Sequence, residues 1–267
     1  MRLPKLLLGT AMAAMLCGTL AAQQASMGFY TVSCVKARVG KALELRQLID
    51  QVSPKLDQAI VASGRATNII VLEAEIPEGE AAPCDYEFVT FDKGMPPGPW
   101  AKGEFAEVLQ KAGIQDSAES LMEKRESVGK LMWTGIWHSD TYVGPGKEMH
   151  YLVVNSINPP DFAACEAYEN KEWKPLAEEM LKEGTISGWA MDARGLPNGT
   201  KDGAPLVTVD LFPSWDAAMN YGSSIGSAWK KLHGDSSAML AGTQFDKLCP
   251  REHTALYRAI YSTTAKK

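Results

Sequence analysis

The sequence predicts an α+β fold built from two tandem βαββαβ modules. Its 267 residues are 45% hydrophobic and 22% charged, a composition typical of a globular chain with room for two modest domains. When the chain is aligned with itself, turn-forming residues recur after about 120 positions. Strand and helix patterns follow the same order in both copies, so we expect one module at 28–145 and a second at 149–263.

Prolines and glycines carry the repeat. Proline fills only 15 of 267 positions, so two aligned pairs of prolines on either side of an aligned pair of glycines are unlikely by chance. The matched pairs, each 120 or 121 residues apart, are Pro54 with Pro175, Gly64 with Gly184, and Pro77 with Pro197. The first and last strands of the copies also align, as do Tyr30 with Tyr151 and Trp137 with Tyr257.

Each copy contains the same succession of hydrophobic patterns. The first begins with an alternating stretch, FYTVSCVKA, and continues with apolar residues at helical spacing. Two β-rich stretches, a second helical pattern and an alternating segment, WTGIWHS, follow. The expected strands are 29–38, 67–76, 85–91, 131–142, 150–157, 185–195, 205–212 and 252–262, and the expected helices are 41–63, 100–127, 161–183 and 215–247.

Pro54 and Pro175 fall inside the first long helix of each copy. Proline cannot donate to the helical hydrogen-bond ladder and disfavours helix in the residue before it. We therefore expect each helix to kink or restart at its proline, with Ser53 as the cap of the restarted piece in the first copy.

Tandem modules of this order, with proline-containing helices and aromatic residues in their last strands, resemble the dimeric α/β-barrel superfamily. That group includes antibiotic-biosynthesis-type monooxygenases, haem-degrading enzymes and chlorite-dismutase-like proteins. The resemblance covers residues 28–263 and is architectural. It implies two ferredoxin-like modules packed sheet to sheet as an α/β barrel within one chain, with helices outside and, in many members, a ligand between the sheets. Such a fold hosts many functions and does not choose among them.

The first 22 residues have the layout of a secretory signal peptide. Arg2 and Lys5 precede an apolar run from Leu6 to Leu20, which is too short to span a bilayer and is followed by small residues. Without residues 1–22 the chain has 25 Lys and Arg against 32 Asp and Glu, a net charge of −7. We therefore expect a periplasmic or secreted protein that has no membrane attachment after cleavage and does not bind nucleic acid.

Four cysteines remain after the signal peptide, an even number in a protein bound for an oxidising compartment. A ferredoxin-like sheet has strand order 4-1-3-2, which brings the first strand of a module beside the start of its third strand. The start of the first helix likewise approaches the start of the fourth strand. We predict one disulfide per module, Cys34–Cys84 and Cys165–Cys249, with four free thiols as the alternative.

The last strand of each copy carries the candidate ligand-binding residues. Strand alternation places Trp133 and Trp137 on one face, and His253, Tyr257 and Tyr261 on the matching face of the second copy. Large rings with a polar atom suit the wall of a cavity. We take Trp133, Trp137, His253 and Tyr257 as the candidate site, and a packed aromatic core as the alternative.

The remaining motifs support neither a metal site nor a resident cofactor. The histidines at 138, 150, 233 and 253 show no spacing typical of metal ligands, and no catalytic constellation is recognisable. The sequence thus indicates a secreted or periplasmic protein, expected to be monomeric, that binds a small hydrophobic ligand or acts as an accessory protein. The alternatives are an oxidative enzyme of the monooxygenase or haem-binding type and a scaffold for protein interaction.

Overall fold

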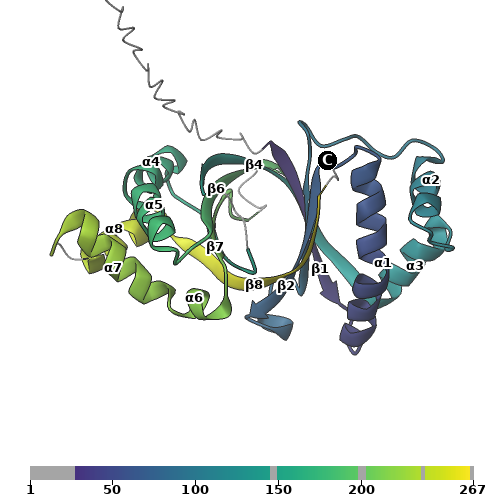
Figure 1. Cartoon of the computed structure of the whole chain (residues 1–267), viewed down its shortest axis with the longest axis horizontal. Coiled ribbons are helices and arrows are strands. Elements are labelled where there is room, and N and C mark those ends of the chain that lie inside the picture. Colours follow the sequence, from purple (N-terminus) through teal and green to yellow (C-terminus); the bar gives the residue numbers. More distant parts are fainter. Residues whose placement is uncertain (1–27, 145–148, 198–202, 236–237, 265–267) are drawn as a thin grey trace, which may run out of the picture.

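The computed structural model describes residues 28–144, 149–197, 203–235 and 238–264. Its centre is a closed barrel of eight antiparallel strands (Figure 1). The α+β class and the barrel agree with the prediction. The predicted signal peptide at 1–22 lies outside the described residues.

The first half of the chain supplies four strands and three helices in the order βαββααβ, where the predicted second helix is divided in two. Its elements are β1 (Phe29–Ala37), α1 (Ala42–Ala62), β2 (Asn68–Ile76), a 3-10 turn (Gly79–Ala81), β3 (Tyr86–Phe91), α2 (Glu104–Lys111), α3 (Ala118–Val128) and β4 (Gly129–Val143). Each predicted strand of this half lies within about two residues of its observed bounds.

The second half repeats the order of strands with its helices divided further. Its elements are β5 (Tyr151–Ile157), α4 (Phe162–Tyr168), the π-helical turn η2 (Glu169–Trp173), α5 (Lys174–Glu183), β6 (Gly188–Leu196), β7 (Leu206–Phe212), α6 (Trp215–Met219), α7 (Tyr221–His233), α8 (Ala238–Leu248) and β8 (Arg251–Thr264). Both halves therefore follow the ferredoxin-like plan.

The barrel closes because the two sheets join at both edges. The order around the barrel is β1-β3-β2-β8-β5-β7-β6-β4, which gives each half the ferredoxin-like order 4-1-3-2. The last strand of each half pairs with the second strand of the other, as β2 with β8 and β4 with β6. Closure leaves no strand edge unpaired along the main body of the barrel, and it creates an interior shared by both halves.

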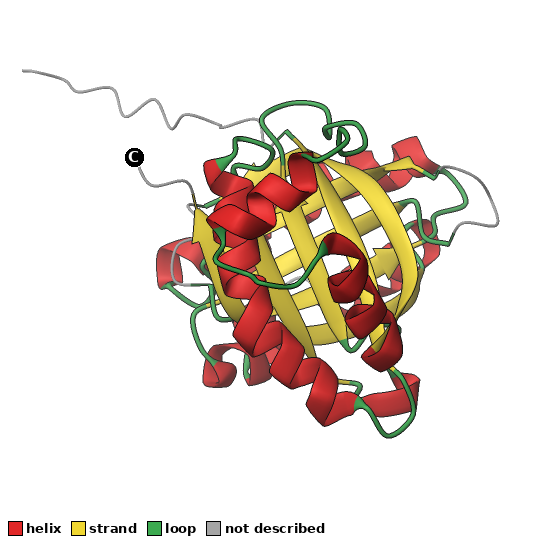
Figure 2. Cartoon of the chain, turned by 90° about the vertical axis from the view of Figure 1, so that its right-hand side faces the viewer, coloured by secondary structure: helices red, strands yellow, loops and turns green. Residues whose placement is uncertain are grey.

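Helices cover the outside of the barrel on opposite sides. Helices α1 to α3 lie over the sheet of the first half and α4 to α8 over that of the second (Figures 1 and 2). The largest apolar core lies beneath the second group, around Trp189, Phe212 and Met180. A smaller core around Ile49 and Val71 lies beneath α1. Within the described ranges no helix combines the length and apolar character needed to cross a membrane.

Both predicted disulfides are present. Cys34 on β1 is bonded to Cys84 just before β3, with 5.3 Å between their Cα atoms. Cys165 in α4 is bonded to Cys249 just before β8, with a Cα separation of 5.2 Å. Each bond closes within one half, because the 4-1-3-2 strand order brings these pairs together.

The two prolines of the repeat have different outcomes. In the second half the helix ends in the π-helical turn and restarts at Lys174, so Pro175 lies in the first turn of α5 as expected. In the first half the predicted restart is wrong, because α1 runs through Pro54 without interruption and Ser53 caps no helix. The carbonyl four residues before Pro54 belongs to Asp50, which is exposed, so water can replace the missing donor.

Candidate functional site

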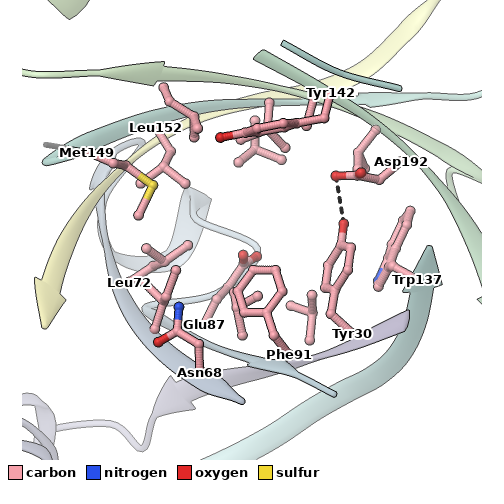
Figure 3. A pocket seen from close by; sticks show the side chains of 18 of the residues that line it. Tyr30, Asn68, Leu72, Glu87, Phe91, Trp137, Tyr142, Met149, Leu152 and Asp192 are labelled. Carbon is pink, nitrogen blue, oxygen red and sulfur yellow. Dashed lines mark hydrogen bonds between the residues drawn. The ribbon is translucent and has the colours of Figure 1, made fainter. Parts of the chain in front are cut away.

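The barrel interior contains a cavity of about 520 Å³. Seven strands, β1 to β7, contribute inward-facing side chains to its wall (Figure 3). Most of these side chains are apolar, among them Val32, Leu72, Val89, Leu152, Val207 and Leu211. The barrel interior is therefore only partly filled by side chains. The volume of the remaining cavity is in the range of small-molecule pockets.

Two of the four predicted site residues lie in the cavity wall. Trp137 on β4 is buried, and the guanidinium carbon of Arg194 lies 4.8 Å from the centre of one of its rings. Trp133 also lines the cavity but is 37% exposed, which places it near the opening. Arg194 itself belongs to the wall, so a cation–aromatic contact forms one corner of the cavity.

Tyr257 points to the interior but does not line the cavity. It is buried in the inner core on β8, and its hydroxyl donates to Oε1 of Glu87 at 3.0 Å. Glu87 on β3 does line the cavity (Figure 3). Tyr257 therefore influences the cavity indirectly, through its hydrogen bond to the carboxyl group of Glu87.

Neither His253 nor Tyr261 lines the cavity. His253 does share a face of β8 with Tyr257, as predicted, and is paired with Ser156 of β5, which belongs to the cavity wall. Tyr261 packs outside the barrel and bonds to Asp57 of α1. A shift of register near Leu72 of β2 interrupts the alternation along β8 and turns Tyr261 outward.

A second tyrosine–carboxyl pair faces the cavity from the other side. The hydroxyl of Tyr30 on β1 donates to Oδ2 of Asp192 on β6 at 2.8 Å (Figure 3). Both side chains line the cavity and both are buried. The Tyr30–Asp192 and Tyr257–Glu87 pairs each join one half of the chain to the other, so neither site would exist without barrel closure.

Burial sets the electrostatics of these pairs. Desolvation raises the pKa of Asp192 to about 7, and the Tyr30 and Ser139 side chains moderate the rise. Desolvation also raises the pKa of Glu87 to about 7 against the hydrogen bond from Tyr257. The pKa of Tyr30 is raised well above its usual value by burial and by the neighbouring carboxyl. Each carboxyl group can therefore gain or lose a proton near neutral pH.

A third acid, Asp92, follows β3 and lines the cavity. Burial raises its pKa to about 6, with Arg65 opposing the rise. Its two carboxylate oxygens are buried and accept no hydrogen bond from the described residues. The wall thus combines three carboxyl groups with one guanidinium, that of Arg194.

The sequence reasoning missed Glu87, Asp192 and Asp92. A signal did exist for the first, because Glu87 alternates with Val89 and Phe91 in the segment YEFVTF. The other face of that strand, with Tyr86 and Phe88, is also apolar, so the pattern alone could not tell which face is inside.

Another pair of buried acids lies outside the barrel. Asp210 on β7 and Glu169 in the π-helical turn are covered by the helices of the second half. Asn155 donates to Oδ2 of Asp210 at 3.4 Å. Burial, together with the neighbouring Asp210 charge, raises the pKa of Glu169 to about 8, and burial raises that of Asp210 to about 7.

The cavity does not suit haem. All four histidines lie in the described part of the chain and none lines the cavity, and the cysteines described are in disulfides. The wall thus lacks the nitrogen and thiolate ligands that most often hold haem iron. Its three acids would also oppose the two carboxylates of the porphyrin. Among the residues the structure describes, no group of three or more His, Cys, Asp or Glu could hold a metal ion.

Comparison with known proteins identifies the fold. No family model and no curated protein sequence matches the chain. A monooxygenase candidate from Lactobacillus acidophilus superposes with a TM-score of 0.51 at 12% identity, covering 88% of this chain and 95% of its own. An anthrone oxidase-like protein superposes with a TM-score of 0.54 at 11% identity, covering 90% of this chain and 94% of its own. These structures share the α/β-barrel fold of this chain.

A third structure extends this result. A monooxygenase candidate from Fusobacterium nucleatum superposes with a TM-score of 0.52 at 9% identity, covering 90% of this chain and 95% of its own. Similarity at this level of identity establishes the α/β-barrel architecture over nearly the whole described chain. The activity has to be argued from the cavity of this protein.

Proposed function

We propose that the protein binds a small, largely hydrophobic molecule inside the barrel. The observation that carries the proposal is the cavity of about 520 Å³, whose wall is mostly apolar with a few convergent polar groups. An interaction scaffold would need no such space, and its barrel could be filled by its own side chains. The binding residues include Trp137 and, at the opening, Trp133.

Filling the cavity tests this function. Val209 on β7 lines the cavity, so a Val209→Trp substitution should place an indole ring in the ligand space. We expect the affinity for N-phenyl-1-naphthylamine, a neutral apolar fluorophore, to fall about tenfold or more, because the ring excludes the volume that the probe occupies. Fluorescence titration of the purified mature protein gives the dissociation constants.

Val39→Trp is the matched control, because Val39 is fully exposed and lies outside the cavity wall. Its affinity for the fluorophore should equal that of the unsubstituted protein. Absence of binding to the unsubstituted protein, or equal binding by Val209→Trp, contradicts the proposal.

We further propose that the protein acts as a monomer in the periplasm or outside the cell. The two disulfides suit an oxidising compartment, and a barrel closed within one chain needs no second copy to complete it. Amino-terminal sequencing of the exported protein would locate the cleavage site, expected after residue 22. Light scattering would give the oligomeric state.

Oxidation of the bound molecule is the second candidate function. The observation that favours it is a pair of acids, Asp192 and Glu87, each with a pKa of about 7 in an apolar cavity. Either carboxylate could take a proton from a carbon acid such as anthrone, and reaction of the anion with O2 would then give anthraquinone and water. Oxygen uptake with anthrone supports this activity, whereas binding without uptake supports the binding function alone.

A further inference from the structure

The mostly apolar wall of the cavity also carries ionisable groups, and most of them are acids. Glu87, Asp92 and Asp192 contribute three carboxyl groups, and Arg194 is the one cation among the described residues that line the cavity. The guanidinium carbon of Arg194 lies above a Trp137 ring at 4.8 Å. Ionised carboxylates in such a wall are costly unless a cation accompanies them.

Asp192 brings a carboxyl group to the cavity wall. Its Oδ2 accepts a hydrogen bond from the Tyr30 hydroxyl at 2.8 Å, and its Oδ1 is buried, with Ser139 beside the carboxyl group on β4. The hydrogen bond from Tyr30 favours the ionised carboxylate and holds its orientation. A carboxylate has about four acceptor sites, so Oδ2 can accept a further hydrogen bond from a ligand donor.

Aromatic rings surround this acceptor. Tyr30, Trp137 and Tyr142 line the same part of the cavity (Figure 3). The faces of such rings attract cations, and their edges pack against hydrocarbon. An ammonium group would therefore find both a carboxylate and aromatic faces, while its hydrocarbon part contacted the wall residues Leu152, Val207 and Leu211.

We propose that the ligand is a hydrophobic amine, bound with its ammonium group on the carboxylate of Asp192 and its hydrocarbon part in the apolar remainder of the cavity. This inference rests on the proposed binding function and adds the charge class of the ligand. An anionic ligand would add a like charge to a wall that already carries three acids. With a neutral ligand, the acids would have no cationic partner from the ligand and would stay protonated.

Three naphthalene compounds of nearly equal size test the charge class: 1-naphthylmethylamine, 1-naphthylmethanol and 1-naphthoate. Calorimetric titration of the mature protein near neutral pH gives the three affinities. We expect the amine to bind about 10- to 100-fold more tightly than the alcohol, because it forms a charge-assisted hydrogen bond in a desolvated site. The carboxylate should bind most weakly.

Asp192→Asn removes the charge while keeping the shape of the side chain. We expect the variant to lose the preference for the amine and to bind the amine and the alcohol with similar affinities, because the charge-assisted hydrogen bond is removed. Retained binding of the alcohol also shows that the barrel of the variant is folded. Asp216→Asn is the matched control, because Asp216 is exposed on α6, away from the cavity wall, and should leave all three affinities unchanged.

The outcomes separate the two proposals. If the alcohol or the carboxylate binds the unsubstituted protein as tightly as the amine, the amine proposal is wrong and the binding function stands. An amine preference that persists in Asp192→Asn also overturns the role of Asp192. If none of the compounds binds and N-phenyl-1-naphthylamine does not bind either, the binding function itself fails.

Discussion

Two regions of this protein that contain buried acids can be compared, the barrel interior and the outer face of the second sheet. Inside, Asp192 and Glu87 each accept a hydrogen bond from a tyrosine and border a cavity. Outside, Asp210 and Glu169 lie in a core packed by helices, and both oxygens of Glu169 lack a hydrogen-bond partner among the described residues.

The comparison shows that a perturbed pKa does not by itself define a binding site. Burial raises the pKa of the acids to about 7 or 8 in both regions. The interior pairs border the cavity, whereas Asp210 and Glu169 are buried beside the packed outer core. The outer pair therefore affects mainly stability, whereas the inner pairs are available for binding.

The largest expected effect contrasts the packing of the two regions. Phe212 in the outer core is fully buried, with its ring centre 5.0 Å from that of Tyr221. Phe212→Ala should lower the free energy of unfolding by about 3–5 kcal/mol, because it leaves a void in a packed core. Phe91→Ala should cost only about 1–2 kcal/mol, because Phe91 already borders a cavity.

Urea unfolding of the two variants and of the unsubstituted protein measures both costs. Equal losses for Phe212→Ala and Phe91→Ala would show that the interior is as tightly packed as the outer core.

The second prediction concerns the pH dependence of stability. Because the pKa of Glu169 rises from its usual 4.5 to about 8 on folding, the folded protein holds more protons between those values. The free energy of unfolding should therefore fall as the pH rises through this window. Glu169→Gln cannot ionise and should be more stable than the unsubstituted protein at pH about 9, by about 2–4 kcal/mol.

Glu178→Gln is the control, because Glu178 is exposed on α5. Urea unfolding followed over the pH range should give this variant the same slope as the unsubstituted protein. If Glu169→Gln keeps that slope as well, Glu169 is not the group that titrates.

The smallest expected effect belongs to the interior. Tyr257→Phe removes the hydroxyl that donates to Glu87. Since that hydrogen bond stabilises the ionised form, we expect the pKa of Glu87 to rise above its value of about 7. The loss in the free energy of unfolding should be about 1 kcal/mol.

Carbon-13 NMR of the labelled glutamate carboxyl groups would follow the titration of Glu87 in both proteins. An unchanged pKa would mean that Tyr257 and Glu87 are not bonded in solution.

Much of the architecture could be predicted because it depends on local patterns. The alternation in FYTVSCVKA and the spacing of apolar residues before Gly64 indicate a strand followed by a helix, wherever these segments pack. Once the βαββαβ order is known, the sheet order follows and brings the cysteines of each half together. Pro54 shows the limit of such rules, since α1 continues through it.

The candidate site was predicted only in part. Trp137 lies in the cavity wall because alternation along β4 holds at that point. Tyr261 was misplaced because β8 changes register beside β2 at Leu72, whereas His253 keeps the predicted face without lining the cavity. Register shifts of this kind depend on the neighbouring strand, so they leave no mark in the segment itself.

The sequence by itself determined the strands and helices, the α+β class and the pairing of the cysteines, because each depends on residue periodicity or on the order of elements along the chain. Only the tertiary structure decided that Tyr30 meets Asp192 and that Tyr257 meets Glu87, since these pairs are separated by 162 and 170 residues and come together when the barrel closes. The same closure encloses the cavity and raises the pKa of both acids, because it removes their carboxyl groups from water.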